Sequence, residues 1–189
     1  SAPATFTLLT SENSLEWSST DVGNNGQWDT AASANWINLS NSQQTVFNSA
    51  DQVLFDDTVD APTTVTINNT VLPSVVTVNS STNNYTFSGS GAISGGASLI
   101  KKGSSTLTIY AANFTGPVTI NGGTIYAGNN SFKNVASVTI TNNSTLDFGG
   151  GGYNNLPIIV SGAGVNGLGA LFNSYDDYPS ETLAIRLAG

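Results

Sequence analysis

The side chains that most enzymes use for catalysis near neutral pH are scarce in this chain. Its 189 residues include no His and no Cys. A His-based catalytic triad, a thiol nucleophile, a thiolate metal site and a disulfide are therefore excluded. Only four Lys and Arg residues accompany twelve Asp and Glu residues, which gives a net charge of −8. This charge argues against nucleic acids and anionic membranes as partners.

Two adjacent aspartates, Asp56 and Asp57, are the first candidates for acid–base chemistry. Clustered aspartates act as acid and base in β-helix polysaccharide hydrolases. Neighbouring residues on one strand point to opposite faces, however, so this pair does not converge on a substrate by itself. We interpret the pair as a turn at the end of a strand, and we predict that the chain is not an enzyme.

A second acidic group lies near the end of the chain and consists of Asp176, Asp177 and Glu181. Carboxylate oxygens are the ligands that Ca²⁺ prefers, so these residues are weak candidates for a calcium site. Their spacing lacks the regular Gly/Asp pattern of calcium-binding β-rolls, which favours an ordinary polar loop. We predict no cofactor, with Ca²⁺ as the one ion for which ligands are present. The adjacent Lys101 and Lys102 are interpreted as a solvated pair at a corner.

Aromatic residues are the stronger candidates for ligand binding. Exposed rings stack on the C–H faces of sugars, while neutral Asn and Thr side chains bond to the hydroxyl groups. The candidate ligand-binding residues are Trp17, Trp28, Trp36, Tyr153, Tyr175 and Tyr178. The competing interpretation is that the tryptophans form the core of a cap and that the tyrosines lie at corners between strands.

An internal repeat predicts the elements that would position these residues. The segments 117–121, 137–141 and 157–161 recur at an interval of 20 residues and place apolar residues at alternate positions. A fixed period near 20 with strand–turn–strand units is typical of a solenoid. Further strands are expected at 53–55, 64–67, 75–78, 85–87, 98–100, 106–109, 124–126, 145–148 and 183–187. We therefore predict an all-β chain folded as a parallel β-helix, or β-solenoid.

Small and polar residues punctuate the expected strands. Gly and Asn tolerate the positive φ that tight corners need, and the glycines at 149–152 are interpreted as a wide corner rather than a phosphate loop. Asn121, Asn142 and Asn143 recur at equivalent corners, and stacked asparagines of this kind can bond to one another along a solenoid. We predict such an asparagine ladder as a structural feature.

The first 50 residues differ from the rest because strand alternation fades and all three tryptophans occur there. A solenoid exposes an apolar end and an unpaired sheet edge unless something covers them. We therefore predict an aromatic N-terminal strand or cap region at residues 1–50 and β-helix coils at residues 51–189. No stretch has the length and polarity of a linker, so both belong to one predicted structural domain.

A stretch in the middle of the chain contains a recognisable series of motifs. In order they are Ser98-Leu99-Ile100-Lys101-Lys102-Gly103, Ser105-Thr106-Leu107-Thr108-Ile109, Ala112-Asn113-Phe114-Thr115-Gly116 and Val118-Thr119-Ile120-Asn121-Gly122-Gly123-Thr124-Ile125. This series resembles the autotransporter-associated β-strand repeat, with Ser104-Ser105 where glycine is common and Phe114 where tyrosine is usual. The segments 26–30, 53–57 and 164–171 are similar to sequences that flank such repeats.

The resemblance implies a right-handed parallel β-helix cut from a larger secreted or surface-displayed bacterial protein. In that family the repeat is thought to assist secretion and to build a stalk, and it has no common catalytic residues. We therefore expect a non-catalytic extracellular stalk or adhesion module at the cell surface. The alternative is a carbohydrate-binding module of a secreted polysaccharide-degrading enzyme. Expected partners are a polysaccharide or surface glycan and other domains of the parent chain, with no nucleic acid and no membrane insertion by this segment.

Overall fold

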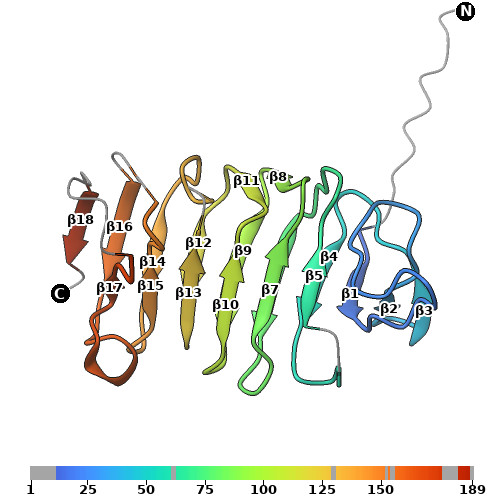
Figure 1. Cartoon of the computed structure of the whole chain (residues 1–189), viewed down its shortest axis with the longest axis horizontal. Helices are drawn as coiled ribbons and strands as arrows, with labels where there is room; N and C mark the ends of the chain where they lie inside the picture. Colours follow the sequence, from blue (N-terminus) through green and yellow to red (C-terminus); the bar gives the residue numbers. More distant parts are fainter. Residues whose placement is uncertain are drawn as a thin grey trace, which may run out of the picture.

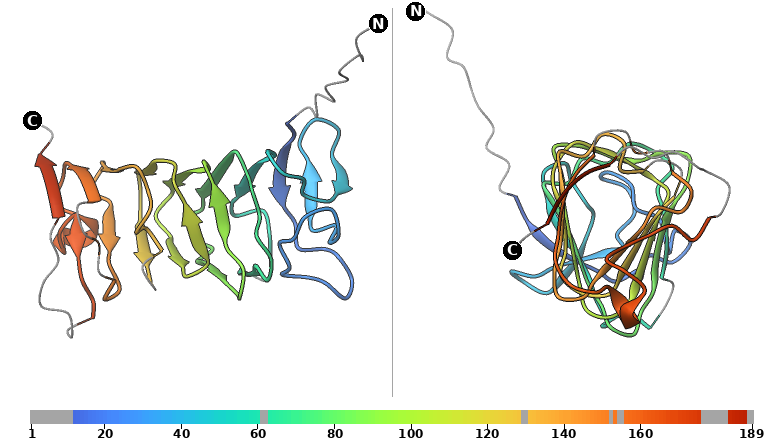
Figure 2. Two further views of the ribbon diagram at one scale, coloured as in Figure 1. Left: turned by 90° about the horizontal axis from the view of Figure 1, so that it is seen from above. Right: turned by 90° about the vertical axis from the view of Figure 1, so that its left-hand side faces the viewer.

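The computed structural model of the chain is an elongated stack of strand-built coils (Figure 1). It describes residues 12–60, 63–128, 131–151, 153 and 156–175, together with the backbone of residues 183–187. About five turns follow one another along the long axis, and the described residues form strands and a single short 3-10 helix at Val165–Gly167. The predicted all-β, parallel β-solenoid is confirmed. Seen along its axis, the stack has a roughly triangular outline (Figure 2).

The largest sheet has ten strands in the order β18-β16-β14-β12-β9-β6-β4-β1-β2-β3. Its strands are β1 (Ser14–Trp17), β2 (Trp36–Asn38), β3 (Gln43–Thr45), β4 (Gln52–Phe55), β6 (Val75–Asn79), β9 (Ser98–Lys102), β12 (Val118–Ile120), β14 (Val138–Ile140), β16 (Leu156–Val160) and β18 (Leu183–Leu187). From β1 through β4 to β18 every pairing is parallel.

Two further sheets complete the coils. The second sheet has six parallel strands: β5 (Thr64–Thr66), β7 (Tyr85–Ser88), β10 (Thr106–Ile109), β13 (Thr124–Ala127), β15 (Thr145–Asp147) and β17 (Leu171–Phe172). The third sheet pairs β8 (Ile93–Gly95) with β11 (Ala112–Phe114). Each turn therefore passes from the first sheet to the second, and one stretch of the stack has a short third side.

The sequence repeat corresponds to the register of the coils. Val118 of β12 lies opposite Val138 of β14, which lies opposite Ile158 of β16. The predicted interval of 20 residues is therefore the length of one turn in this part of the stack. Leu99 pairs with Val118, and that turn has 19 residues, whereas the preceding turn from Val76 to Leu99 has 23.

Residues before β4 pair differently from the rest of the chain. β2 runs antiparallel to both β1 and β3, and these pairings were not foreseen from the sequence. β1 also pairs in parallel with β4, so the N-terminal strands continue the first sheet of the coils. Figure 2 shows them at the opposite end of the stack from β18.

Inward rows of branched aliphatic side chains form one continuous core. Along β10 and β13 every second residue is buried, as the alternation of apolar and polar residues predicts. Leu107 and Ile125 lie opposite each other inside, while Thr106 and Thr124 lie opposite each other on the outward row. Each fully buried aliphatic side chain contributes roughly 1.5–3 kcal/mol to folding. The stack is thus stabilised by contacts between aliphatic side chains at equivalent positions of successive turns.

At the corners, successive turns approach each other so closely that some positions accept only glycine. Gly103 has φ +71°, and a Cβ atom placed there would lie 2.2 Å from the carbonyl oxygen of Ser80 in the preceding turn. Such a distance is far below van der Waals contact. Gly103 is therefore required by the stacking distance and by its own backbone conformation.

Replacing Gly103 with Ala tests this close approach. We expect Gly103→Ala to lower the free energy of unfolding by about 1–3 kcal/mol or more, because the methyl group forces the two turns apart. Gly96→Ala is the matched control, since a Cβ atom at Gly96 meets nothing within 4 Å, and it should change stability by less than about 1 kcal/mol. Urea denaturation monitored by tryptophan fluorescence measures both. Equal effects of the two substitutions would contradict the account.

Candidate functional site

The three tryptophans come together, but inside the molecule. The ring centroids of Trp17 and Trp36 are 4.9 Å apart, and those of Trp28 and Trp36 are 5.4 Å apart. Phe47 and Phe55 pack against the same cluster. All three indoles are buried, and their Nε1–H groups have no hydrogen-bond partner among the described residues. A ring enclosed in this way offers no face to a sugar, so the structure favours the core interpretation for these three residues.

A buried asparagine fixes the loop that carries this cluster. The Asn35 side-chain Nδ2 donates to the carbonyl oxygens of Asn24 and Gln27 at 2.7 and 2.9 Å. Its Oδ1 accepts the backbone N–H of Asp21 at 2.9 Å. Because buried amide groups are costly without partners, these bonds hold the loop in one conformation.

The tyrosine candidates separate into different environments. Tyr153 is buried, and its hydroxyl donates to the carbonyl oxygen of Ala127 at 2.5 Å. Tyr175 is 53% exposed and remains available to a ligand. Tyr178 and the calcium candidates Asp176, Asp177 and Glu181 lie outside the described residues. Within the described part of the chain, no three His, Cys, Asp or Glu side chains gather in a way that could hold a metal ion.

The carboxylate of Asp57 holds a corner of the next turn. It accepts the hydroxyl of Ser80, the backbone N–H groups of Ser81, Thr82 and Asn83 at 2.8–3.1 Å, and the Thr82 hydroxyl at 2.8 Å. The Ser80 hydroxyl and these N–H groups hold the pKa of Asp57 well below its usual range. A carboxylate engaged in this way is a poor general acid, and the turn interpretation of the Asp56-Asp57 pair gains support.

Asp56 instead faces Glu16 of β1. The Thr58 hydroxyl lies 2.9 Å from Glu16 Oε1 and 2.6 Å from Asp56 Oδ1, so it bridges the two carboxyl groups. Burial raises the pKa of Glu16, and the Thr58 hydroxyl offsets part of that effect. Glu16 and Thr58, but not Asp56, border an open hollow of about 520 Å³. No basic side chain lines the hollow.

Of the two neighbouring lysines, one is buried and the other is exposed, which corrects the interpretation of both as a solvated pair. Lys101 is fully buried, because it occupies an inward position of β9 between Val78 and Ile120 of the neighbouring strands. Its Nζ donates to the carbonyl oxygens of Lys102 and Gly103 at 2.7 and 3.0 Å. Lys102 is exposed as predicted. Burial lowers the pKa of Lys101 to about 8, while the charge of Asp57 acts in the opposite direction.

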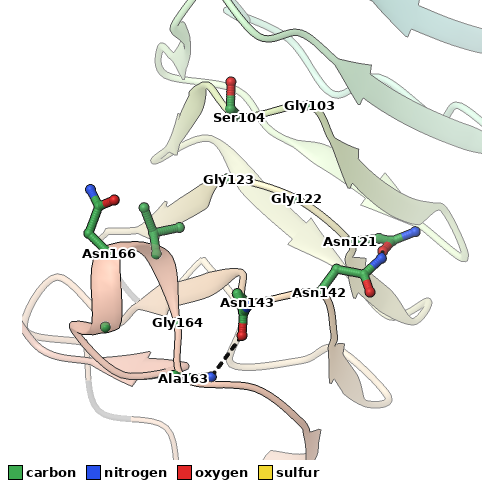
Figure 3. Close-up of a pocket in the computed structure, with 12 residues that line it drawn as sticks. Gly103, Ser104, Asn121, Gly122, Gly123, Asn142, Asn143, Ala163, Gly164 and Asn166 are labelled. Atoms are coloured by element: carbon green, nitrogen blue, oxygen red, sulfur yellow. Dashed lines mark hydrogen bonds between the residues drawn. The ribbon is translucent and has the colours of Figure 1, made fainter.

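An open groove runs across four successive corners near the C-terminal end of the stack (Figure 3). Its volume is about 570 Å³, and every residue that lines it is uncharged. The lining residues are Gly103, Ser104, Asn121, Gly122, Gly123, Asn142, Asn143, Ala163, Gly164, Val165, Asn166 and Gly167. Many of its lining residues are glycines, which carry no side chains, and none of the lining side chains is ionisable.

Within this groove the predicted asparagine ladder is present as a single bond between two asparagines. Asn142 Nδ2 donates to Asn121 Oδ1, and the Thr141 hydroxyl contributes a second bond of 3.2 Å to the same oxygen. Asn143 Oδ1 accepts the backbone N–H of Ala163 at 3.0 Å (Figure 3). These side chains form hydrogen bonds with neighbouring turns, which favours a structural role.

Exposed aromatic residues lie on and beside the second sheet, and of these only Tyr175 was among the ligand-binding residues predicted from the sequence. Outside the buried core, the described aromatic residues are Tyr110, Tyr126, Phe172 and Tyr175, and we call them the aromatic face. The ring centroids of Tyr110 and Tyr126 are 5.9 Å apart. Tyr126 and Phe172 occupy the same outward row, on either side of Asp147.

Comparison with known proteins adds no relative: no family model matches the chain, and neither a curated protein nor a solved structure is similar to it. The fold therefore rests on the stacked coils themselves, and family membership stays a prediction from residues 98–125. No helix among the described residues has the length and apolar character needed to cross a bilayer.

Substituting Lys101 tests its role as a buried donor. Because its folded pKa is lowered to about 8 from 10.5, the unfolded chain holds the proton across this interval and the folded protein does not. Stability should therefore rise with pH between about 8 and 10 in the wild type relative to Lys101→Met. At pH 7 we expect Lys101→Met to lose about 1–3 kcal/mol, because two carbonyl groups lose their donor.

The matched control is Lys102→Met, which alters the exposed neighbour. Urea denaturation at pH 7, 8, 9 and 9.5 gives the free energy of unfolding for all three proteins. Lys102→Met should follow the wild-type pH profile. Parallel profiles for the wild type and Lys101→Met would contradict the buried location of the ammonium group.

Proposed function

We propose that this chain is a non-catalytic extracellular module that serves as a rigid stalk or adhesion segment of a larger secreted or surface bacterial protein. The observation that carries the proposal is the unbroken register of the first sheet. Seven parallel pairings link β1 to β18 through β4 and the later coils. A continuous ladder around a filled core resists bending, which is what a stalk needs.

The contacts of Asp57 and Lys101, two residues of types that often act in catalysis, also support a structural role. The Asp57 carboxylate is bonded to the loop at 80–83, and the Lys101 ammonium is bonded to two carbonyl oxygens of its own corner. General acid–base catalysis needs such groups free to meet a substrate. Here they hold the corners in place.

The resemblance in the middle of the chain agrees with this role. Leu99, Lys101 and Gly103 match the Leu-x-Lys-x-Gly pattern of the autotransporter-associated repeat, and in this chain they fill the core, bond the corner and permit close stacking. We extend the proposal to the right-handed winding that the resemblance implies and to a capping role for the buried tryptophans. Secretion and a location at the cell surface belong to the same proposal.

Rigidity can be measured directly because the chain contains no cysteine. Spin labels attached to Leu72→Cys and Leu168→Cys, which replace leucines 42% and 61% exposed, would lie toward different ends of the coils. Double electron–electron resonance should give one narrow distance distribution that broadens only in denaturant. A broad or multi-peaked distribution in buffer would contradict a rigid stalk.

The non-catalytic part of the proposal has its own test. Incubation with neutral and acidic polysaccharides, with and without Ca²⁺, should release no reducing ends above a heat-denatured control. Release of sugars that Asp57→Ala abolishes would show instead that the chain is a glycan-active enzyme.

A further inference from the structure

We propose that the aromatic face binds a neutral polysaccharide. The face consists of Tyr110, Tyr126, Phe172 and Tyr175 on the outward side of the second sheet and the corner beside it. This assigns a ligand class and a location to the adhesive role proposed above, but it does not depend on the rigidity of the stack.

The distribution of aromatic residues is the first observation. Every other aromatic side chain in the described residues is buried: Trp17, Trp28, Trp36, Phe47, Phe55, Tyr85, Phe87, Phe114, Phe132, Phe148 and Tyr153. Tyr110, Phe172 and Tyr175 are 38%, 37% and 53% exposed, and Tyr126 is partly exposed. Rings scattered at random would not gather on one side of a triangular stack.

The register of the coils explains how the rings align. Thr108, Tyr126, Asp147 and Phe172 lie opposite one another on β10, β13, β15 and β17. Adjacent strands in a sheet are about 4.8 Å apart, so this row runs along the long axis of the molecule. Tyr110 lies beside Tyr126 with its ring at 67° to it. The aromatic face is therefore an elongated strip, which suits a chain ligand better than a single sugar.

Glycines beneath the rings are the second, independent observation. A Cβ atom at Gly128 would lie 2.4 Å from Tyr110 Cε1, and one at Gly149 would lie 2.5 Å from Tyr126 Cζ. At Gly150 the corresponding distance to Tyr175 Cδ1 is 2.9 Å. The three tyrosine rings thus pack against bare backbone. This packing limits the orientations of the rings before any ligand arrives, and such preorganisation reduces the entropy cost of binding.

Polar groups accompany the rings. Asp147 Oδ1 accepts the backbone N–H groups of Gly149 and Ser174, each at 3.0 Å, which fixes the carboxylate between Tyr126 and Phe172. Asn173 Oδ1 accepts the N–H groups of Gly150 and Tyr175 and so positions the corner that carries Tyr175. Asp147 is buried, so these bonds order the corner beneath the rings, and the exposed rings themselves offer the surface on which the C–H faces of a pyranose chain stack.

Charge selects among polysaccharides. The one carboxylate in the row, Asp147, is buried, the aromatic face includes no Lys or Arg, and the whole chain has a net charge of −8. An anionic polysaccharide would be repelled, because no cation on the face compensates its charge. A neutral polysaccharide has no such penalty, and its binding should depend little on salt.

Affinity gel electrophoresis tests the proposal with the whole chain. Native gels containing hydroxyethylcellulose, galactomannan or a mixed-linkage β-glucan should retard the wild type in at least one case. Tyr126→Ala and Tyr175→Ala should each weaken that binding about two- to tenfold, as expected for the loss of one ring contact. Tyr126→Phe should bind like the wild type because it keeps the ring.

Three controls separate binding from folding. Leu39→Ala removes an exposed apolar side chain from another part of the molecule and should not change retardation. Gly128→Ala keeps all four rings but collides with Tyr110, so it should weaken binding without removing an aromatic residue. Fluorescence of the buried tryptophans reports whether each variant is folded.

Several results would overturn the inference. No retardation of the folded wild type in any of the three neutral gels would do so, and would leave the rings as corner packing or as a surface for a protein partner. Retardation that survives the double variant Tyr126→Ala/Tyr175→Ala would place binding elsewhere. Stronger, salt-sensitive retardation by polygalacturonate would show that charge rather than stacking drives binding. None of these results bears on the spin-label distances, so the stalk proposal is tested separately.

Discussion

The whole structure depends on one distance, the spacing of about 4.8 Å at which each turn must lie on the turn before it. Strands meet this requirement easily, but corners do not, because their backbone groups lack regular partners. Different corners are stabilised by different contacts. Gly103 lets two turns touch, Asp57 binds the N–H groups of the next corner, and Lys101 bonds the carbonyl groups of its own. These few charged side chains stabilise the stack where hydrogen bonds between strands end.

The same spacing also organises the surface. Because strands stack in register, any residue type repeated at one outward position becomes a row along the long axis. Asn121 and Asn142 form such a pair at one corner, and one hydrogen bond joins their side chains. On the second sheet the row contains Tyr126 and Phe172, whose rings take no part in the backbone hydrogen bonds between strands. A solenoid therefore separates structural rows from rows that are free to bind, and this separation supports assigning different roles to the groove and to the aromatic face.

Much of this fold could be predicted from residue spacing, because inward positions of a parallel stack repeat with the turn. The 20-residue interval at 117–161 predicted the pairings of β12 with β14 and of β14 with β16 correctly. The antiparallel strand β3 was missed because Gln43 and Gln44 give no alternating apolar pattern. The burial of Lys101 was missed because a charged side chain was expected to be exposed. Its position in the strand indicated the opposite, since Leu99 two residues earlier points inward. Tyr126 follows the inward Ile125, and glycines lie at the next corners. This signal could have identified the aromatic face.

The most direct test of the central claim is a measurement of register between turns. In an NMR spectrum of the isotope-labelled protein, nuclear Overhauser effects should connect β12 with β14 in the pattern of parallel strands. Thr119 should lie opposite Thr139, with Val118 opposite Val138. Close Hα–Hα contacts of antiparallel pairs, or contacts that match 118–120 with any segment other than 138–140 and 99–101, would contradict the stacked coils.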